Sequence, residues 1–199
     1  MKTLLCLASL LLLPTALLAV EAPLNVTQSS LKFTGHAFMH DFNGEAKQFN
    51  GSAEMDPKKP TVESAKIEIK AARMTTFESE RDHEMLAWLH VDVNPDLSFH
   101  LTRVTVVSGD PGRATKDHPA QFTVQGTFTL NHVSKPLEAQ ADGWREGDLL
   151  VVAGKTKVDT ASYGLPIIKK FFMTVGKDVD VDFHLAFDLP KSLSWPSVQ

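Results

Sequence analysis

Hydrophobic and polar residues alternate with a period of two along much of the chain. From Val179 to Leu189 every odd-numbered residue is apolar, and the even-numbered ones are polar except for Ala186. From Gln121 to Asn131 the non-polar residues take the even positions. Because alternate side chains of a strand point to opposite faces, each segment predicts a strand with one buried and one solvent-facing side. Such half-polar strands are typical of an antiparallel sheet.

Shorter segments with the same pattern raise the expected number of strands to about eight. We expect these further strands near residues 31–40, 49–55, 64–71, 97–102, 137–145 and 149–158. The periodicity by itself does not separate a two-sheet sandwich from a closed barrel. Strands of about eleven residues reach about 35 Å, which suits a deep barrel better than a small sandwich. The predicted inner face mixes large with small residues, and a partly filled barrel of this size can hold one small ligand.

One stretch between the strands has a different period. Thr75 and Glu78 fit a capping box, in which a Ser or Thr and a Glu three residues later satisfy backbone N–H groups at a helix start. Apolar residues then recur at roughly helical spacing up to Leu89. We therefore expect one short helix over about residues 77–89, with its apolar side on the end of the sheet. Because no helices separate the other strands, the pattern excludes a parallel α/β sheet.

The first nineteen residues have the features of a secretory signal peptide. Lys2 precedes a nearly continuous apolar stretch over residues 4–13, and the segment ends in the small residue Ala19. The stretch is shorter than the ~20 residues of a membrane span. We expect residues 1–19 to be removed, residues 20–190 to form one barrel domain and residues 191–199 to form a loose C-terminal tail. Cys6 is the one cysteine, so the exported chain would carry no thiol, which favours a periplasmic protein.

Composition and charge exclude several classes of protein. The chain has 199 residues, 43% of them hydrophobic, which is enough for one good core. Lys and Arg total 20 against 24 Asp and Glu, a formal net charge of −4. Because no run of Lys and Arg offsets this balance, we do not expect a nucleic-acid partner.

Several motifs spread over the chain occur together in a known family. Residues 124–137, VQGTFTLNHVSKPL, are similar to a V-x-G-x-L-T-L-x-G-V-T-K-P-V segment. Residues 44–56, 80–99, 159–165 and 175–179 are similar to further segments of the same set. Together they resemble the YceI-like family of lipid- and polyisoprenoid-binding proteins, although Ala46 stands where an aromatic residue is usual and His132 where glycine is usual. The resemblance implies a lipocalin-like periplasmic barrel that encloses a long isoprenoid or fatty chain and catalyses nothing.

An apolar lumen is the main requirement for such a carrier. Burying each methylene of a ligand contributes roughly 0.8 kcal/mol, so no reactive group is needed. The candidate ligand-binding residues are Phe33, Ile67, Ile69, Leu97, Phe99, Phe122, Val124, Phe128, Val181, Phe183 and Leu185. The alternative is that these side chains simply fill a closed core, in an interaction or stress-response module.

A polar mouth could hold the head group of the ligand. Lys169 and Lys170 lie in an apolar loop and could meet a phosphate, while Phe171 and Phe172 could seal the opening. The cationic side chains at and within the predicted helix are equally suitable head-group candidates. They are Arg73, Arg81 and His83.

Metal-binding and catalytic motifs are not apparent in the sequence. His36 and His40 are four residues apart, which on a strand separates them by about 13 Å. A looser cluster has no recognised ligand spacing and consists of Asp82, His83, His90 and Asp92. No G-x-S-x-G or H-E-x-x-H motif occurs, so we expect neither an enzyme nor a cofactor other than a bound lipid or isoprenoid. A histidine-based metal-binding protein remains an alternative, and the sequence is compatible with a homodimer or a membrane-associated partner.

Overall fold

The computed structural model describes residues 19–38, 40–170, 173–193 and 195, and most of them form strands. The strands are β1 (Val20–Pro23), β2 (Ser30–Ala37), β3 (Asp41–Ala46), β4 (Phe49–Met55), β5 (Val62–Lys70), β6 (Met74–Thr75), β7 (Asp96–Ser108), β8 (Ala120–Leu130), β9 (Val133–Glu146), β10 (Leu149–Asp159), β11 (Lys169–Lys170) and β12 (Met173–Asp188). The helix α1 spans Ser79–Trp88, and short 3-10 helices span Val26–Gln28 (η1), Ala71–Arg73 (η2) and Thr160–Tyr163 (η3). Within these residues no helix is both long and apolar enough to cross a bilayer.

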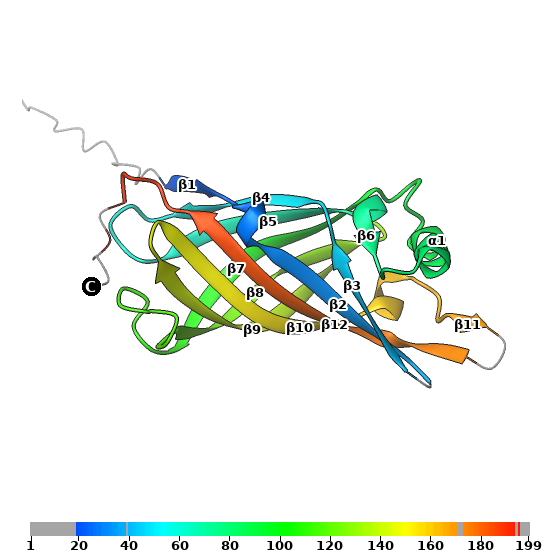
Figure 1. Ribbon diagram of the computed structural model, residues 1–199. Coiled ribbons are helices and arrows are strands. Elements are labelled where there is room, and N and C mark those ends of the chain that lie inside the picture. Colours follow the sequence, from blue (N-terminus) through cyan, green and yellow to red (C-terminus); the bar gives the residue numbers. More distant parts are fainter. Residues whose placement is uncertain (1–18, 39, 171–172, 194, 196–199) are drawn as a thin grey trace, which may run out of the picture.

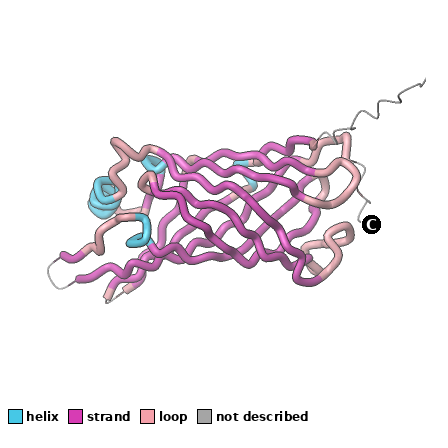
Figure 2. Tube along the Cα trace, turned by 180° about the vertical axis from the view of Figure 1, so that it is seen from behind, coloured by secondary structure: helices cyan, strands magenta, loops and turns pink. Residues whose placement is uncertain are grey.

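The strands form one antiparallel sheet that closes into a barrel (Figures 1 and 2). The pairing order is β1-β4-β5-β7-β8-β9-β10-β12-β2-β3-β6, with β11 paired to β12. Three long strands are interrupted: η1 separates β1 from β2, two residues separate β3 from β4, and η2 separates β5 from β6. Counting each interrupted pair once, with β7, β8, β9, β10 and β12, gives eight long strands. The predicted all-β antiparallel barrel with one short helix is therefore confirmed.

The seam of the barrel closes along β12. The strand β12 pairs with β2, from Asp180 opposite Thr34 to His184 opposite Ser30. Further along, Leu24 bridges to Phe187, and the Asn25 N–H donates to the Ala186 carbonyl at 2.8 Å. Both halves of the first long strand therefore contact the last one.

Strand bulges explain where the sequence pattern misplaced a strand end. The expected strand at 97–102 continues as β7 to Ser108. Its pairing with β8 shifts between Leu101 and Arg103 and again between Val106 and Ser108. Because a bulge inserts an unpaired residue, it breaks the alternation by which a strand is recognised.

The helix exists as predicted, but its start is different. Glu78 is the N-cap, and its carboxylate accepts hydrogen bonds from the backbone N–H groups of Glu80 (3.2 Å) and Arg81 (2.8 Å). Thr75 does not cap the helix, because its hydroxyl donates to Asp82 at 2.6 Å. Phe77 has φ +65° and turns the chain before the first helical residue. The capping box at Thr75 and the start at residue 77 were therefore wrong.

The two ends of the barrel differ. The first, which we call the helix end, carries α1, η3, β11 and the β2–β3 turn, while β1 and the C-terminal segment lie at the opposite end (Figure 1). At the opposite end Leu193 and Trp195 pack against a buried cluster, and the Trp195 indole N–H donates to the Asp56 carbonyl at 2.8 Å. The expectation of a loose tail therefore does not hold for these two residues.

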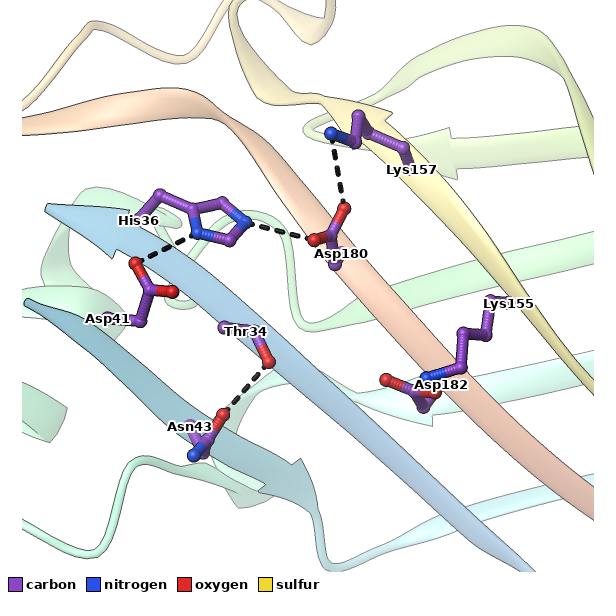
Figure 3. A network of polar contacts seen from close by, with 8 residues as sticks. All are labelled: Thr34, His36, Asp41, Asn43, Lys155, Lys157, Asp180 and Asp182. Carbon is purple, nitrogen blue, oxygen red and sulfur yellow. Dashed lines mark hydrogen bonds and ion pairs between the residues drawn. The ribbon is translucent and has the colours of Figure 1, made fainter.

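A polar network on the outer surface joins the strands at the seam (Figure 3). His36 of β2 lies between two carboxylates, with Nδ1 3.0 Å from Asp41 of β3 and Nε2 3.0 Å from Asp180 of β12. Lys157 of β10 also pairs with Asp180, at 3.4 Å. Hydrogen bonds from the His36 ring to the carboxylates of Asp41 and Asp180 raise the pKa of His36. A neutral imidazole has one N–H, so only the protonated ring can donate to both carboxylates.

We expect His36→Gln to lower the melting temperature more at about pH 5.5 than at about pH 9. Because the pKa of His36 is raised in the folded state, its stabilisation is complete below the unfolded value of ~6.5 and is lost as the pH rises through the folded value. Thermal unfolding followed by circular dichroism across this range measures the effect. His40→Gln, on the neighbouring turn and outside the network, is the control. A loss of stability independent of pH would contradict this role of the network.

Candidate functional site

The barrel encloses a cavity of about 1100 Å³. Its lining includes Glu80 of α1 at the helix end and Pro111 and Trp195 at the opposite end, so the cavity follows the length of the barrel. This volume is above the roughly 300–1,000 Å³ of common small-molecule pockets. The buried side chains gather in three separate clusters around this space.

The inward-facing residues expected from the alternation surround this cavity. The following eleven line it: Phe33, Ile67, Ile69, Leu97, Phe99, Phe122, Val124, Phe128, Val181, Phe183 and Leu185. Phe171 and Phe172 lie outside the described residues. The cavity shows that these side chains do not pack into a solid core, and their contact with a ligand stays a prediction.

Further lining residues were not singled out from the sequence. Phe42 of β3, Leu137 and Ala139 of β9, and Val152 of β10 also face the cavity. The alternation of β9 and β10 contained the signal for three of them. Phe42 had no comparable signal, because β3 has only six residues and includes Gly44.

Pairs of glycine and phenylalanine keep the lumen open. A Cβ on Gly44 would clash with the ring of Phe33, and one on Gly126 would clash with the ring of Phe99. Three further rings lie in the same way over glycines of a neighbouring strand: Phe42 over Gly35, Phe122 over Gly143 and Phe183 over Gly154. Each ring takes the space of the missing side chain and lies along the wall. Large aromatic residues therefore line the barrel without meeting at its axis.

The helix α1 closes much of the lumen at the helix end. Met85 and Leu89 are buried in a cluster with Leu97 and Tyr163. The Trp88 indole N–H donates to the Pro166 carbonyl at 2.8 Å, which ties the helix to the loop before β11. Phe128 packs edge-on against Tyr163, with ring centroids 5.7 Å apart. The helix is therefore part of the cavity wall.

A half-buried carboxylate attaches α1 to the barrel. Asp82 accepts hydrogen bonds from the Thr75 hydroxyl (2.6 Å), the Thr76 hydroxyl (2.6 Å) and the Thr76 N–H (2.5 Å). Burial raises the pKa of Asp82, but these hydrogen bonds outweigh it and hold the pKa below its usual value. Asp82 is thus a structural anchor at neutral pH.

Charged side chains gather where the lumen reaches the helix end. Glu78, Glu80, Arg81 and Glu84 line it from the segment of α1. Arg81 donates to the Thr76 hydroxyl and carbonyl, each at 2.9 Å, and lies 5.1 Å from the centroid of the Phe42 ring. This end offers both acidic and basic groups.

The head-group candidates are only partly brought together. Arg81 and Lys169 line the cavity, whereas Arg73 and His83 are exposed and do not. Lys170 pairs through its backbone with Met173. Lys177 also lines the cavity, although the sequence analysis did not select it. Its ammonium group lies 2.6 Å from the Asp159 carboxylate, and the hydrogen bond that it donates there raises the pKa of Lys177.

The described side chains include no arrangement suited to metal chemistry. Across residues 19–38, 40–170, 173–193 and 195, no three His, Cys, Asp or Glu side chains are placed to hold a metal ion. The carboxylate oxygens of Asp82 and Glu78 accept hydrogen bonds from backbone N–H groups and, for Asp82, also from hydroxyl groups. The geometry is that of an enclosed apolar site with acidic and basic side chains at its helix end.

An eight-stranded antiparallel barrel around an apolar lumen is the architecture of ligand-enclosing barrels of the lipocalin type. The family model of the YceI-like domain matches residues 23–187, and the chain belongs to this family.

Relatives and solved structures agree with this assignment. A UPF0312 protein of Pseudomonas aeruginosa is 29% identical over 120 residues, covering 59% of this chain and 56% of the relative. A UPF0312 protein of Pectobacterium carotovorum is 25% identical over 120 residues, covering 59% of this chain and 55% of the relative. The chain thus spans just over half the length of these relatives.

Two solved structures share the fold at low sequence identity. BcnA of Burkholderia cenocepacia superimposes with a TM-score of 0.69 at 15% identity, covering 82% of this chain and 98% of that one. A polyisoprenoid-binding domain from Saccharophagus degradans gives a TM-score of 0.66 at 16% identity, covering 85% of this chain and 98% of that one.

Proposed function

We propose that this protein is an exported, non-enzymatic binding protein for one long apolar molecule, such as a polyisoprenoid, an isoprenoid quinone or a fatty-acid derivative. The observation that carries the proposal is the apolar lumen of about 1100 Å³ along the barrel axis. A filled barrel acting only as an interaction module would not contain such a space.

The physical chemistry of the lumen favours an acyl or prenyl chain. Each methylene moved from water into the lumen contributes roughly 0.8 kcal/mol, and the costs of association and ordering subtract from the total. A chain of about fifteen carbons therefore retains a net driving force without any reactive group. The name of the Saccharophagus degradans neighbour, a polyisoprenoid-binding domain, supports the same class of ligand.

The polar end of the ligand would lie at the helix end of the lumen. There Arg81, Lys169 and Lys177 meet the cavity together with Glu80 and Glu84. Because both charges are present, this arrangement favours a head group that is neutral or carries both charges over a bare anion. The chain of the ligand would then run along Phe99, Phe128 and their neighbours.

Native mass spectrometry of the protein purified without detergent from the periplasmic fraction tests the proposal. We expect a noncovalent adduct at one-to-one stoichiometry, which organic extraction releases as a long-chain molecule, and a mature N-terminus after Ala19. A protein without adduct that also fails to take up a fluorescent prenyl or fatty-acyl probe would refute the binding function. An uncleaved N-terminus in the cytoplasmic fraction would refute export alone.

A further inference from the structure

Large exposed hydrophobic side chains gather at the helix end of the barrel. Phe38 is 81% exposed, Phe77 and Val93 are each 66% exposed, and Ile167 is 49% exposed. They lie on four different loops: β2–β3, β6–α1, α1–β7 and η3–β11. Figure 1 places all four loops around the same end. The barrel therefore presents an apolar rim, defined by these four residues, at the mouth of an apolar lumen.

The backbone at Phe77 shows that barrel stability does not explain this residue. Its φ of +65° lies in the left-handed region, which is unfavourable for a bulky side chain and easy for glycine. Because the ring is 66% exposed, it gains little packing energy to offset this strain. The Lys47 ammonium lies 5.7 Å from the ring centroid. Glycine would form the same turn with less strain. Strain retained at an exposed aromatic residue points to a use outside the barrel.

Two rim residues have a basic side chain in contact with them, and the other two have one two residues further along the chain. Lys47 lies over the ring of Phe77, and His132 Nε2 lies 3.1 Å from the Val93 carbonyl oxygen. His40 follows Phe38 by two residues, and Lys169 follows Ile167 by two. Exposed apolar side chains next to the ammonium groups of Lys47 and Lys169 match the acyl chains and phosphates at a lipid surface.

Acidic groups at the same end are placed differently. Both carboxylate oxygens of Glu78 accept hydrogen bonds from backbone N–H groups at the N-terminus of α1. Glu80 and Glu84 line the lumen, and two exposed carboxylates, those of Glu78 and Asp92, stand next to rim residues in the chain. Two lysines, Lys47 and Lys169, therefore lie near apolar anchors, while the carboxylate of Glu78 caps the helix and those of Glu80 and Glu84 line the lumen.

We propose that the rim at the helix end docks onto the surface of a phospholipid bilayer. The four anchors stand on separate loops and form no contiguous groove, which suits a fluid lipid surface better than a shaped protein partner. Docking there would join the lumen to the bilayer interior, so an apolar ligand would pass between them without crossing water. Only this last step rests on the proposed function; the docking itself does not.

Flotation with protein-free vesicles tests the docking. The vesicles contain phosphatidylethanolamine and phosphatidylglycerol at about 3:1. We expect Phe38→Ser with Phe77→Gly to weaken partitioning by about tenfold per ring, about 100-fold in total. Val26→Ser with Val107→Ser removes two exposed apolar side chains away from the rim and should leave partitioning unchanged. All proteins are purified with the same N-terminus, verified by mass.

Several outcomes would overturn the proposal. These are a wild-type protein that stays off the vesicles, a double variant that binds as well as wild type, or binding that requires vesicles carrying membrane proteins. Val93→Ser with Ile167→Ser gives an independent variant of the same rim and should also reduce partitioning.

Two further measurements separate docking from ligand binding and from folding. Phe77→Gly alone should keep or raise the melting temperature while it weakens vesicle binding, and a fall in both would contradict the proposal. The protein with Phe38→Ser and Phe77→Gly should still take up a soluble prenyl probe, because neither side chain lines the cavity. If wild type binds vesicles through the rim but takes up no probe, docking stands and the proposed function fails.

Discussion

Replacing Ala139 with tryptophan is expected to weaken ligand binding by about two orders of magnitude while the barrel remains folded. Ala139 lies on β9 and lines the cavity. An indole at this position would occupy a section of the lumen that is now open. If it displaces about four methylenes of the ligand at roughly 0.8 kcal/mol each, affinity falls by about two orders of magnitude. Titration with a fluorescent prenyl or fatty-acyl probe measures the loss.

The next residue along the strand provides the matched control. Gln140 points to the outer surface, where it accepts a hydrogen bond from Thr123 at 3.2 Å. Gln140→Trp adds the same indole on the other face of the sheet, so we expect probe affinity close to that of wild type. Equal uptake by folded Ala139→Trp and Gln140→Trp proteins would show that the ligand does not occupy the lumen.

Removing the Asp82 carboxylate is expected to be the most destabilising single change near the mouth. Asp82→Ala deletes three short hydrogen bonds and leaves the Thr75 and Thr76 donors unsatisfied. Hydrogen bonds to a charged group contribute about 1.5–3 kcal/mol each when their partners would otherwise be buried. Allowing for water entering the site, we expect a loss of about 2–4 kcal/mol, or roughly 4–16 °C in melting temperature. Urea unfolding followed by circular dichroism measures it.

The neighbouring residue and the pH dependence distinguish this role from a general effect on the helix. His83→Ala changes an exposed side chain of the same turn and should shift stability by less than about 0.5 kcal/mol. Because the folded pKa of Asp82 is lowered, its stabilisation is present above the unfolded value of ~3.9 and is lost as the pH falls through the folded value. The difference between wild type and Asp82→Ala should therefore shrink only in strong acid. A difference already absent at neutral pH would refute the anchor.

Local chemistry made most of the strands and the helix predictable. Alternation over residues 121–131 corresponds closely to β8, and alternation over 179–189 to the later part of β12, because the two-residue period follows from backbone geometry alone. The start of the helix was predicted less well, because the same side chain can either cap a helix or bond to a residue further along the chain. Thr75 and Glu78 form a capping-box pattern, but the side chain of Thr75 bonds instead to Asp82, seven residues away. The bulges of β7 likewise depend on its pairing with β8.

The head-group candidates show a second kind of limit. Arg73, Arg81 and His83 were equivalent from the sequence, because all three lie at or within the predicted helix. Only Arg81 reaches the cavity, where bonds to Thr76 orient its guanidinium. Lys177 was overlooked because it precedes the alternating segment 179–189 from which the β12 candidates were chosen, and only its place at the mouth distinguishes it.

By itself, the sequence determined that this chain forms half-polar antiparallel strands with a fixed inward face, because side-chain direction along a strand is a local property. Whether those inward side chains meet in a solid core or surround a space was decided only in three dimensions. The rings of Phe33, Phe99 and Phe183 are turned against the wall by glycines on neighbouring strands, and each pair is brought together by strand register. A hollow lumen therefore depends on contacts between strands, which no periodicity within one strand contains.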